Sequence, residues 1–185
     1  NRKMSKSLGN FFTVREAAEV YGYDCIRMFI LMSHYRSPLN YSGEILMQAK
    51  AALERLSTAK DNLDFFCQNG ADGEMTAAET LASLGVYRQK FCDAMDDDFN
   101  TADAISAIFE LVREINSAVS PNAHPTKALA EGCRALYLEL SDVLGIPFTK
   151  KKDELTPEQE ALFNARKDAR KAKNWAESDR IRDEL

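Results

Sequence analysis

A sustained apolar repeat in the middle of the sequence limits the fold more than any other feature of the chain. Between residues 45 and 66 the apolar positions are spaced alternately by four and three residues. They are Ile45, Ala49, Ala52, Leu56, Ala59, Leu63 and Phe66. This spacing draws one apolar stripe along a single helix face, and a stripe of this length packs lengthwise on neighbouring helices. We therefore expect one long helix that starts near Glu44 and is buried along one side.

Three further segments show the same helical spacing. Their apolar positions are Leu84, Tyr87, Phe91 and Ala94, then Ile105, Ile108, Val112, Ile115 and Val119, and finally Leu129, Cys133, Leu136, Leu140 and Leu144. Short loops join the four segments, which is typical of an antiparallel bundle. No segment has the two-residue period of a strand. The sequence therefore predicts an all-α fold with an antiparallel four-helix bundle over residues 42–147.

Shorter helices are expected on both sides of the bundle. The segment Thr13-Val14-Arg15-Glu16 has the form of a capping box, which predicts a helix that ends at Gly22. A second helix is expected over residues 24–34. After the bundle, Thr156-Pro157-Glu158-Gln159 begins another helix, and Asn174 has the position of a cap for the next one. These last two helices predict a partial C-terminal helical hairpin.

The composition excludes several classes of protein. Apolar residues make up 45% of the 185 residues, with 8 Gly and 5 Pro. The chain is therefore too apolar to be disordered and too poor in Gly and Pro to be fibrous. The longest apolar run, Met28 to Met32, is far too short to span a membrane, and the polar start Asn1-Arg2-Lys3 is unlike a signal peptide. We expect a cytoplasmic protein.

Charge and cysteine placement add two constraints. Residues 1–60 carry a net charge of +4, residues 61–149 carry -10, and residues 150–185 carry +1, which together give the chain's net charge of -5. This division predicts surfaces with separate roles. No two of the four cysteines form a C-x-x-C pair, and the chain has only 2 His, so we expect buried thiols and no zinc site within it. The four are Cys25, Cys67, Cys92 and Cys133.

The basic head of the chain is the first motif that suggests chemistry. It reads Lys3-Met4-Ser5-Lys6-Ser7-Leu8-Gly9-Asn10. Two lysines three residues apart, with hydroxyl groups between and after them, can place ammonium groups on a triphosphate and on the charge that develops in nucleotidyl transfer. Lysine suits this role as a point charge on a flexible stem. The alternative is a solvated terminus.

This head resembles the KMSKS signature of class I aminoacyl-tRNA synthetases letter for letter, followed by the Leu-Gly-Asn usual there. Residues 27–42, RMFILMSHYRSPLNYS, resemble the segment after KMSKS in cysteinyl-tRNA synthetase. Residues 94–101, AMDDDFNT, resemble the helical-bundle motif of that family, and residues 166–179, RKDARKAKNWAESD, resemble the start of its anticodon-binding domain. The three segments occur in the family's order and cover essentially the whole chain.

The resemblance implies a function and a division into domains. Residues 1–41 would be the KMSKS loop and a stem-contact segment, residues 42–147 a DALR-like tRNA-binding bundle, and residues 148–185 a truncated anticodon-binding domain. The family activates cysteine with ATP and magnesium to cysteinyl-AMP and transfers it to cysteine tRNA. Its catalytic Rossmann domain, with the HIGH motif and the zinc that selects cysteine, would lie before residue 1. We therefore expect this chain to be inert as a ligase by itself, and monomeric.

The resemblance also assigns roles in the head. Lys6 matches the lysine that the family uses on ATP, and Lys3 assists on the same loop, so both are candidate catalytic residues. They would stabilise the pyrophosphate as the amino-acid carboxylate attacks the α-phosphorus. Ser5 and Ser7 are candidate hydrogen-bond donors to ATP, with loop solvation as the alternative. Met4 belongs to the ATP-binding loop but is expected to pack rather than to react.

In the tail, Arg170, Trp175 and Asp179 match family positions that meet the anticodon. An aromatic face can stack on an unpaired base, arginine can reach base edges or phosphates, and a carboxylate can accept from the N–H groups of guanine. Alternatively, Trp175 is a core residue of the hairpin, and Asp179 is a surface partner of Arg182 or Arg180. Three lysines are candidate phosphate contacts or a solvated helix face: Lys167, Lys171 and Lys173.

Two further features, an acidic run and a lone histidine, are better explained by local helix structure than by a functional site. The run Asp96-Asp97-Asp98 invites a metal site, but adjacent carboxylates on a turn point in different directions, and charges that favour a helix N-terminus are the better account. His34 is expected to cap the end of its helix.

Three alternatives remain at this stage. One is the related ligase that joins cysteine to an amino-sugar in mycothiol synthesis, which lacks an anticodon domain. Another is a different class I synthetase, such as the methionine or arginine enzyme. A third is a helical scaffold that binds proteins and no nucleic acid. Affinity for tRNA that weakens steeply with salt would speak against the scaffold.

Overall fold

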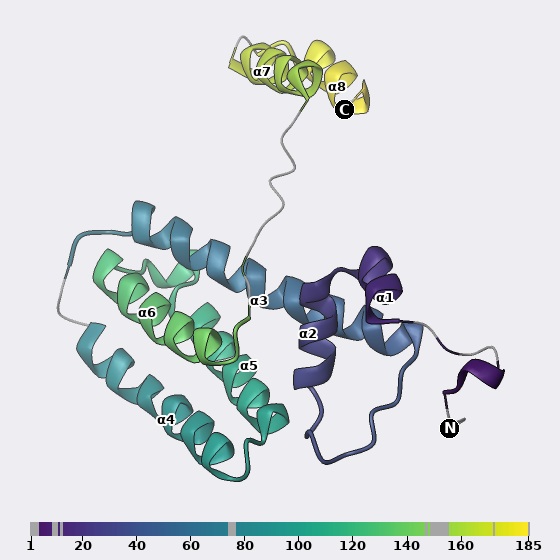
Figure 1. Cartoon of the computed structure of the whole chain (residues 1–185). Coiled ribbons are helices and arrows are strands. Elements are labelled where there is room, and N and C mark those ends of the chain that lie inside the picture. The colour runs from purple at the N-terminus through teal and green to yellow at the C-terminus, as the bar shows by residue number, and fades with distance from the viewer. Residues whose placement is uncertain are drawn as a thin grey trace. The chain divides into compact units, whose positions relative to one another are not determined.

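The computed structural model describes residues 4–8, 11, 13–73, 77–146, 148, 156–171 and 173–184. Contacts divide the chain into two compact units, residues 1–148 and residues 149–185. The described residues are helical, apart from turns, loops and one isolated parallel bridge between Ala71 and Thr126 (Figure 1). The expected all-α fold is therefore confirmed. No described helix combines the length and the hydrophobicity needed to cross a membrane.

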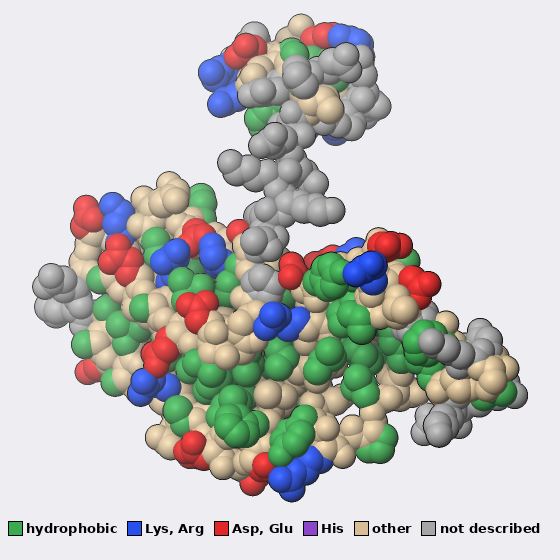
Figure 2. All heavy atoms as spheres, viewed as in Figure 1, with side chains coloured by type: hydrophobic (Ala, Val, Ile, Leu, Met, Phe, Trp, Pro, Cys, Tyr) green, Lys and Arg blue, Asp and Glu red, His purple; other side chains and the backbone are tan. Residues whose placement is uncertain are grey.

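The first unit begins with the segment before the bundle, which we call the head; the lysine-containing residues 3–10 are the head loop. A 3-10 turn, η1 (Lys6–Leu8), precedes α1 (Val14–Tyr21) and α2 (Tyr23–Leu31). The predicted capping box is present, since the Glu16 carboxylate accepts from the backbone and hydroxyl of Thr13 while the Glu16 N–H donates to that hydroxyl. Gly22 separates α1 from α2 with φ of +83°, a conformation that favours glycine. Apolar side chains gather over these two helices (Figure 2), and the large exposed ones are Val14, Val20, Tyr23 and Ile30.

Four helices follow the head and form the bundle. They are α3 (Gly43–Asn69), α4 (Ala77–Asp96), α5 (Thr101–Ala118) and α6 (Lys127–Val143), with a 3-10 turn, η2 (Pro121–Ala123), before α6. The closest pairs of neighbours are α4 with α5 and α3 with α6, and α6 also packs on α4 and α5. Three of these helices, α3, α5 and α6, begin at polar caps, because the side chains of Ser42, Asn100 and Thr126 accept hydrogen bonds from the first turns.

The bundle core lies where the apolar repeat predicts it, with one shift. Ala49, Leu56 and Leu63 of α3 are buried as expected. At the start of α3, however, Leu46 is fully buried and Ile45 only partly. The reason is that this end of α3 faces α2 rather than the bundle, and the Cys25 thiol of α2 lies 3.2 Å from the Leu46 carbonyl oxygen.

A buried polar contact ties α6 to the middle of α3. The Tyr137 side chain is completely buried, and its hydroxyl donates to the Leu56 carbonyl oxygen at 2.8 Å. Burial raises the pKa of this hydroxyl, because the phenolate would lose its hydration. The ring also lies 5.4 Å, centroid to centroid, from that of Phe148.

The second unit is a helical hairpin made of α7 (Pro157–Lys171) and α8 (Trp175–Glu184). The predicted cap at Asn174 is confirmed, since its side-chain oxygen accepts from the Glu177 N–H at 3.3 Å. Lys173 turns the chain with φ of +57°, and the Asn174 N–H donates to the Ala169 carbonyl at 2.8 Å. Among the side chains of α8 that the structure describes, those of Ser178 and Ile181 are buried.

Candidate nucleic-acid interface

Trp175 lies on the surface of the hairpin rather than in its core. It is the first residue of α8, and 59% of it is exposed. The interior of the hairpin is made instead by smaller residues such as Ser178 and Ile181. The structure thus favours the exposed ring over the alternative of a core residue. An exposed indole can stack on an unpaired base.

Arg170 and Asp179 are also exposed, but their surroundings differ. The Arg170 side chain has no hydrogen-bond or ion-pair partner among the described residues. Asp179 accepts from Nη1 of Arg182 at 3.0 Å, so of its two expected partners it pairs with Arg182. Arg180 pairs instead with Glu177, and its hydrogen bond lowers the pKa of that carboxyl.

The three candidate phosphate contacts are exposed lysines near the turn of the hairpin. Lys167 and Lys173 have no ion pair with a described residue, and Lys171 lies 4.0 Å from Asp168, a separation at which solvent screens the attraction. Figure 2 shows lysine and arginine side chains at the surface of this unit. The turn of the hairpin therefore combines an exposed ring with cations that no described carboxylate pairs closely.

The head loop is described only in part. Lys3 lies outside the described residues, as does the side chain of Lys6. The Ser5 and Ser7 hydroxyl oxygens are 3.1 Å apart, and the Leu8 N–H donates to the Ser5 carbonyl. Met4 is exposed, so it does not pack as expected. The hydroxyls of Ser5 and Ser7 thus lie on the same side of a single tight turn.

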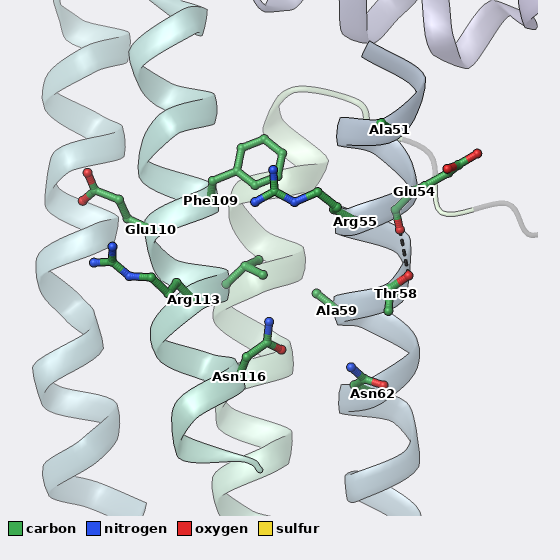
Figure 3. A pocket seen from close by; sticks show the side chains of 11 residues that line it. Ala51, Glu54, Arg55, Thr58, Ala59, Asn62, Phe109, Glu110, Arg113 and Asn116 are labelled. Carbon is green, nitrogen blue, oxygen red and sulfur yellow. Dashed lines mark hydrogen bonds between the residues drawn. The ribbon is translucent and has the colours of Figure 1, made fainter. Parts of the chain in front are cut away.

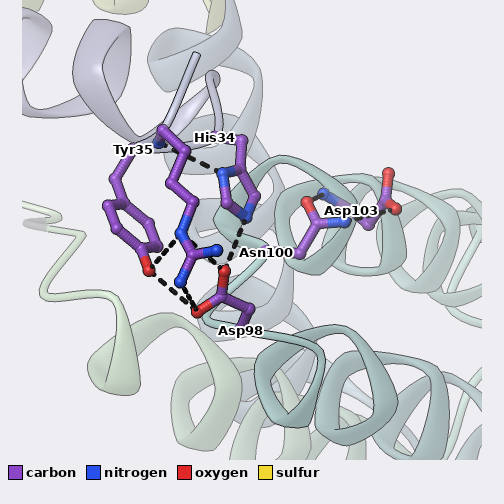
Figure 4. Close-up of polar contacts among 6 residues, drawn as sticks. His34, Tyr35, Asp98, Asn100 and Asp103 are labelled. Atoms are coloured by element: carbon purple, nitrogen blue, oxygen red, sulfur yellow. Dashed lines mark hydrogen bonds and ion pairs between the residues drawn. The ribbon is translucent and has the colours of Figure 1, made fainter.

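A polar network joins the end of the head to the bundle (Figure 4). The Tyr35 hydroxyl donates to Oδ1 of Asp98 at 2.8 Å, and the Arg36 guanidinium contacts the same carboxylate at 3.0 Å. The accepting carboxylate raises the pKa of Tyr35, because it stabilises the protonated hydroxyl. Asp98 and Phe99 both have φ near +55°, a strained conformation for residues other than glycine.

Sequence reasoning missed this network. It placed Asp98 in an acidic run and His34 at a helix cap. The cap assignment is wrong, because α2 ends at Leu31 and Met32 is its C-cap. His34 lies in the next turn, where its Nδ1 accepts from the Arg36 N–H at 3.2 Å. The contacting residues are 62 or 63 positions apart in the sequence. No local sequence signal could therefore have revealed these contacts.

The described residues contain no evident metal site. No three His, Cys, Asp or Glu side chains converge there. The four cysteines are free, and burial raises the pKa of the Cys133 thiol to about 11. The residues of the described chain therefore do not fit a zinc ion.

An open groove of about 710 Å³ runs between α3 and α5 (Figure 3). The Arg55 guanidinium crosses it and lies 4.7 Å from the centre of the Phe109 ring. Thr58, Asn62 and Asn116 line the groove further along. Its walls carry charges of both signs, which gives no preference for one class of ligand.

Comparison with known proteins decides the family. Three family models match the chain in order: the tRNA synthetases class I (C) catalytic domain at residues 1–51, the DALR domain at residues 90–149, and the cysteinyl-tRNA ligase anticodon binding domain at residues 152–185. The cysteine–tRNA ligase of Symbiobacterium thermophilum is 49% identical over 99% of the chain. Those of Lachnospira eligens and Clostridioides difficile are each 46% identical over 100% of it.

The chain belongs to the cysteine–tRNA ligase family. It spans about two fifths of the length of these relatives, 39% of the first two and 40% of the third. The family model for the anticodon binding domain covers the described hairpin, and the model for the DALR domain covers the second half of the bundle. Residues 35 and 36 fall in the catalytic-domain match and Asp98 in the DALR match, so the polar network joins two recognised parts of this family.

One solved structure shares the fold of much of this chain. The LeuRS of Agrobacterium radiobacter K84, solved as a LeuRS–tRNA–LeuAMS ternary complex, superposes with a TM-score of 0.58. The match covers 78% of this chain and 21% of that one at 23% identity. At this identity the likeness shows that the two proteins share a fold. It says nothing about the site residues of the present chain.

Proposed function

We propose that this chain is the C-terminal, tRNA-binding portion of a cysteine–tRNA ligase, and that it carries the loop that closes on ATP. The observation that carries the proposal is the exposed Trp175 ring at the turn of the hairpin, in a segment that matches the family's anticodon binding domain. The parent enzyme would activate cysteine with ATP to cysteinyl-AMP and then transfer it to cysteine tRNA. The remaining catalytic core would be supplied by the part of the relatives that this chain does not span.

The anticodon would be read at the turn of the hairpin. Trp175 would stack on an unpaired base, because an aromatic face accepts the π-face of any base. Arg170 would reach a base edge or a phosphate, since its guanidinium has no partner among the described residues. Asp179 would accept from guanine. Its exposed pair with Arg182 holds it weakly, because solvent screens the attraction.

The head loop would act on ATP. Lys6 would place its ammonium on the phosphates, with Lys3 beside it, and both would favour the charge that builds on the pyrophosphate as the α-phosphorus is attacked. Ser5, Ser7 and Met4 would line this loop. Magnesium would accompany ATP as part of the substrate. The family's zinc would be held outside this chain, because the described residues do not fit one.

Three further properties belong to the proposal. The chain would work in the cytoplasm and as a monomer. By itself it would not exchange pyrophosphate into ATP in the presence of cysteine, and robust exchange would refute the assignment of the catalytic core to a missing part.

A titration of tRNA into the protein tests the proposal. Trp175 is the only tryptophan, so its fluorescence reports on the hairpin alone. Cysteine tRNA should quench the emission more strongly than a non-cognate tRNA, and binding should weaken steeply as salt rises because phosphate contacts release counterions. Equal affinity for both tRNAs would remove the anticodon assignment. Binding of neither would favour a helical scaffold.

A further inference from the structure

We propose that Phe163 of α7 is a second stacking residue for tRNA, which binds an unpaired nucleotide beyond the one at Trp175. The inference rests on the proposed function, because it extends the proposed site along α7 from Arg170. Nothing in the sequence motif singled out Phe163. It is assigned from its exposure and from its place on the helix.

Phe163 is an apolar ring that the hairpin does not bury. Half of it, 51%, is exposed, although it stands in a unit with very little core. The residue before it, Leu162, is more buried, as is Ala169 on the same side of α7. Because α7 packs on α8, the partial burial of these two residues marks the side of α7 toward α8. Phe163 lies about 100° around the helix from Leu162. Packing of the hairpin therefore does not account for the ring.

Phe163 shares a helix stripe with the cations of the proposed site. Lys167 follows it by four residues and Arg170 by seven, so the three side chains lie on one face of α7. Both cations are exposed and have no ion pair with a described residue. An aromatic ring in line with free cations is the surface that binds single-stranded nucleic acid, where rings stack on bases and cations contact the backbone.

No carboxylate interrupts this stripe. Between Phe163 and Arg170, Asp168 is the acidic residue. Its position is about 140° around the helix from Phe163, and it lies beside Lys171 rather than beside Lys167 or Arg170. A negatively charged strand could therefore follow the stripe without passing a carboxylate, which favours RNA over a basic protein partner.

The length of the stripe fits a short run of nucleotides. Seven helical residues rise by about 10.5 Å. Stacked nucleotides of one strand are about 3.4 Å apart. Phe163 would therefore meet a base about three stacked positions away from the nucleotide at Arg170, which places it beside the anticodon rather than on it. Phe163 would add affinity for tRNA and little preference between sequences, because stacking is tolerant of base identity.

The test compares two phenylalanines of similar exposure. In F163A the affinity for cysteine tRNA should fall at least about fivefold, as expected for loss of one stacked base. The slope of affinity against salt should not change, because no charge is removed. The matched control is F65A, since Phe65 of the bundle is 57% exposed. It should bind as the wild type does, and F163W should restore most of the affinity lost in F163A.

Folding of the variant hairpin is checked separately. Alanine is a good helix former and Phe163 is half exposed, so F163A should keep the helical signal and the Trp175 emission of the free wild type. Wild-type affinity in folded F163A would overturn the inference and leave the proposed function standing. So would an equal loss in F65A, which would point to a general effect of surface rings. A wild type that binds no tRNA would overturn both proposals.

Discussion

Replacing Tyr137 by phenylalanine removes one hydroxyl from the bundle and should lower its stability by about 1 kcal/mol near neutral pH. The hydroxyl donates to the Leu56 carbonyl at 2.8 Å in a fully buried setting. A typical internal hydrogen bond has a net contribution of about 0.5–1.5 kcal/mol. The ring, and with it the packing on Phe148, is kept in the variant. For a unit of this size the change corresponds to a melting temperature lower by about 2–4 °C.

The same substitution should change the pH dependence of stability. Burial raises the pKa of Tyr137 above its ordinary value near 10, so above pH 10 the unfolded chain loses this proton while the folded chain keeps it. The folded state then binds more protons, and its stability falls as pH rises, by about 1.4 kcal/mol per pH unit from this residue. Phenylalanine does not ionise. The free energies of unfolding of the wild type and the variant should therefore become equal at about 0.7 unit above pH 10.

Urea denaturation followed by far-ultraviolet circular dichroism measures both effects. The free energies of unfolding of wild type and Tyr137→Phe are compared at pH 8, 10, 10.5 and 11, so that contributions common to both proteins, such as the raised pKa of Cys133, cancel in the difference. A difference that stays constant across this range would show that Tyr137 ionises as readily in the folded as in the unfolded protein. No difference at pH 8 would mean that the bond to Leu56 contributes nothing.

Further predictions concern the loops and the head. Gly70→Ala should destabilise the bundle by about 1–3 kcal/mol in a thermal melt, because the added carbon would lie within 3.0 Å of three backbone atoms. The control is Gly85→Ala, which should be neutral or stabilising because nothing lies within 4 Å of the added carbon there. Asp98→Asn should lower the pKa of Tyr35 toward its ordinary value, seen as an earlier alkaline absorbance change, and an unchanged titration would refute the assigned cause. In a chain extended to include the catalytic domain, Lys6→Ala should slow cysteine adenylation by about a hundredfold, measured by pyrophosphate exchange, and an unaltered rate would exclude the proposed role of this lysine. Zinc chelators should not shift the melting temperature of the present chain, and a shift would show that its cysteines hold metal.

The helices could be predicted because their information is local. The spacing of Ala49, Leu56 and Leu63 fixes which side of α3 is buried, and the cap residues fix where helices begin. At the start of α3, Leu46 is buried in place of the expected Ile45. This shift could not be predicted, since it depends on where α2 packs. Helical spacing describes one helix and carries no information about a second partner on another side.

The candidate site was predictable in its residues but not in its surroundings. The motif indicates Trp175 and Asp179. It does not say whether an indole in the first turn of α8 faces inward or outward, and the structure was needed to place the ring outside. The pairing of Asp179 with Arg182 follows from their spacing of three, but its preference over Arg180 depends on Glu177. The network around Asp98 depends on a left-handed turn that non-glycine residues rarely adopt.

The distribution of aromatic residues gives the two units separate optical signals. The single tryptophan lies in the hairpin, and all 6 tyrosines lie in residues 1–148. Selective excitation of the indole therefore follows the hairpin, while tyrosine absorbance follows the bundle and its head. One sample, without labels or dissection of the chain, can show whether the two units unfold in one transition or in two. If two transitions are seen, each unit has a free energy of unfolding of its own.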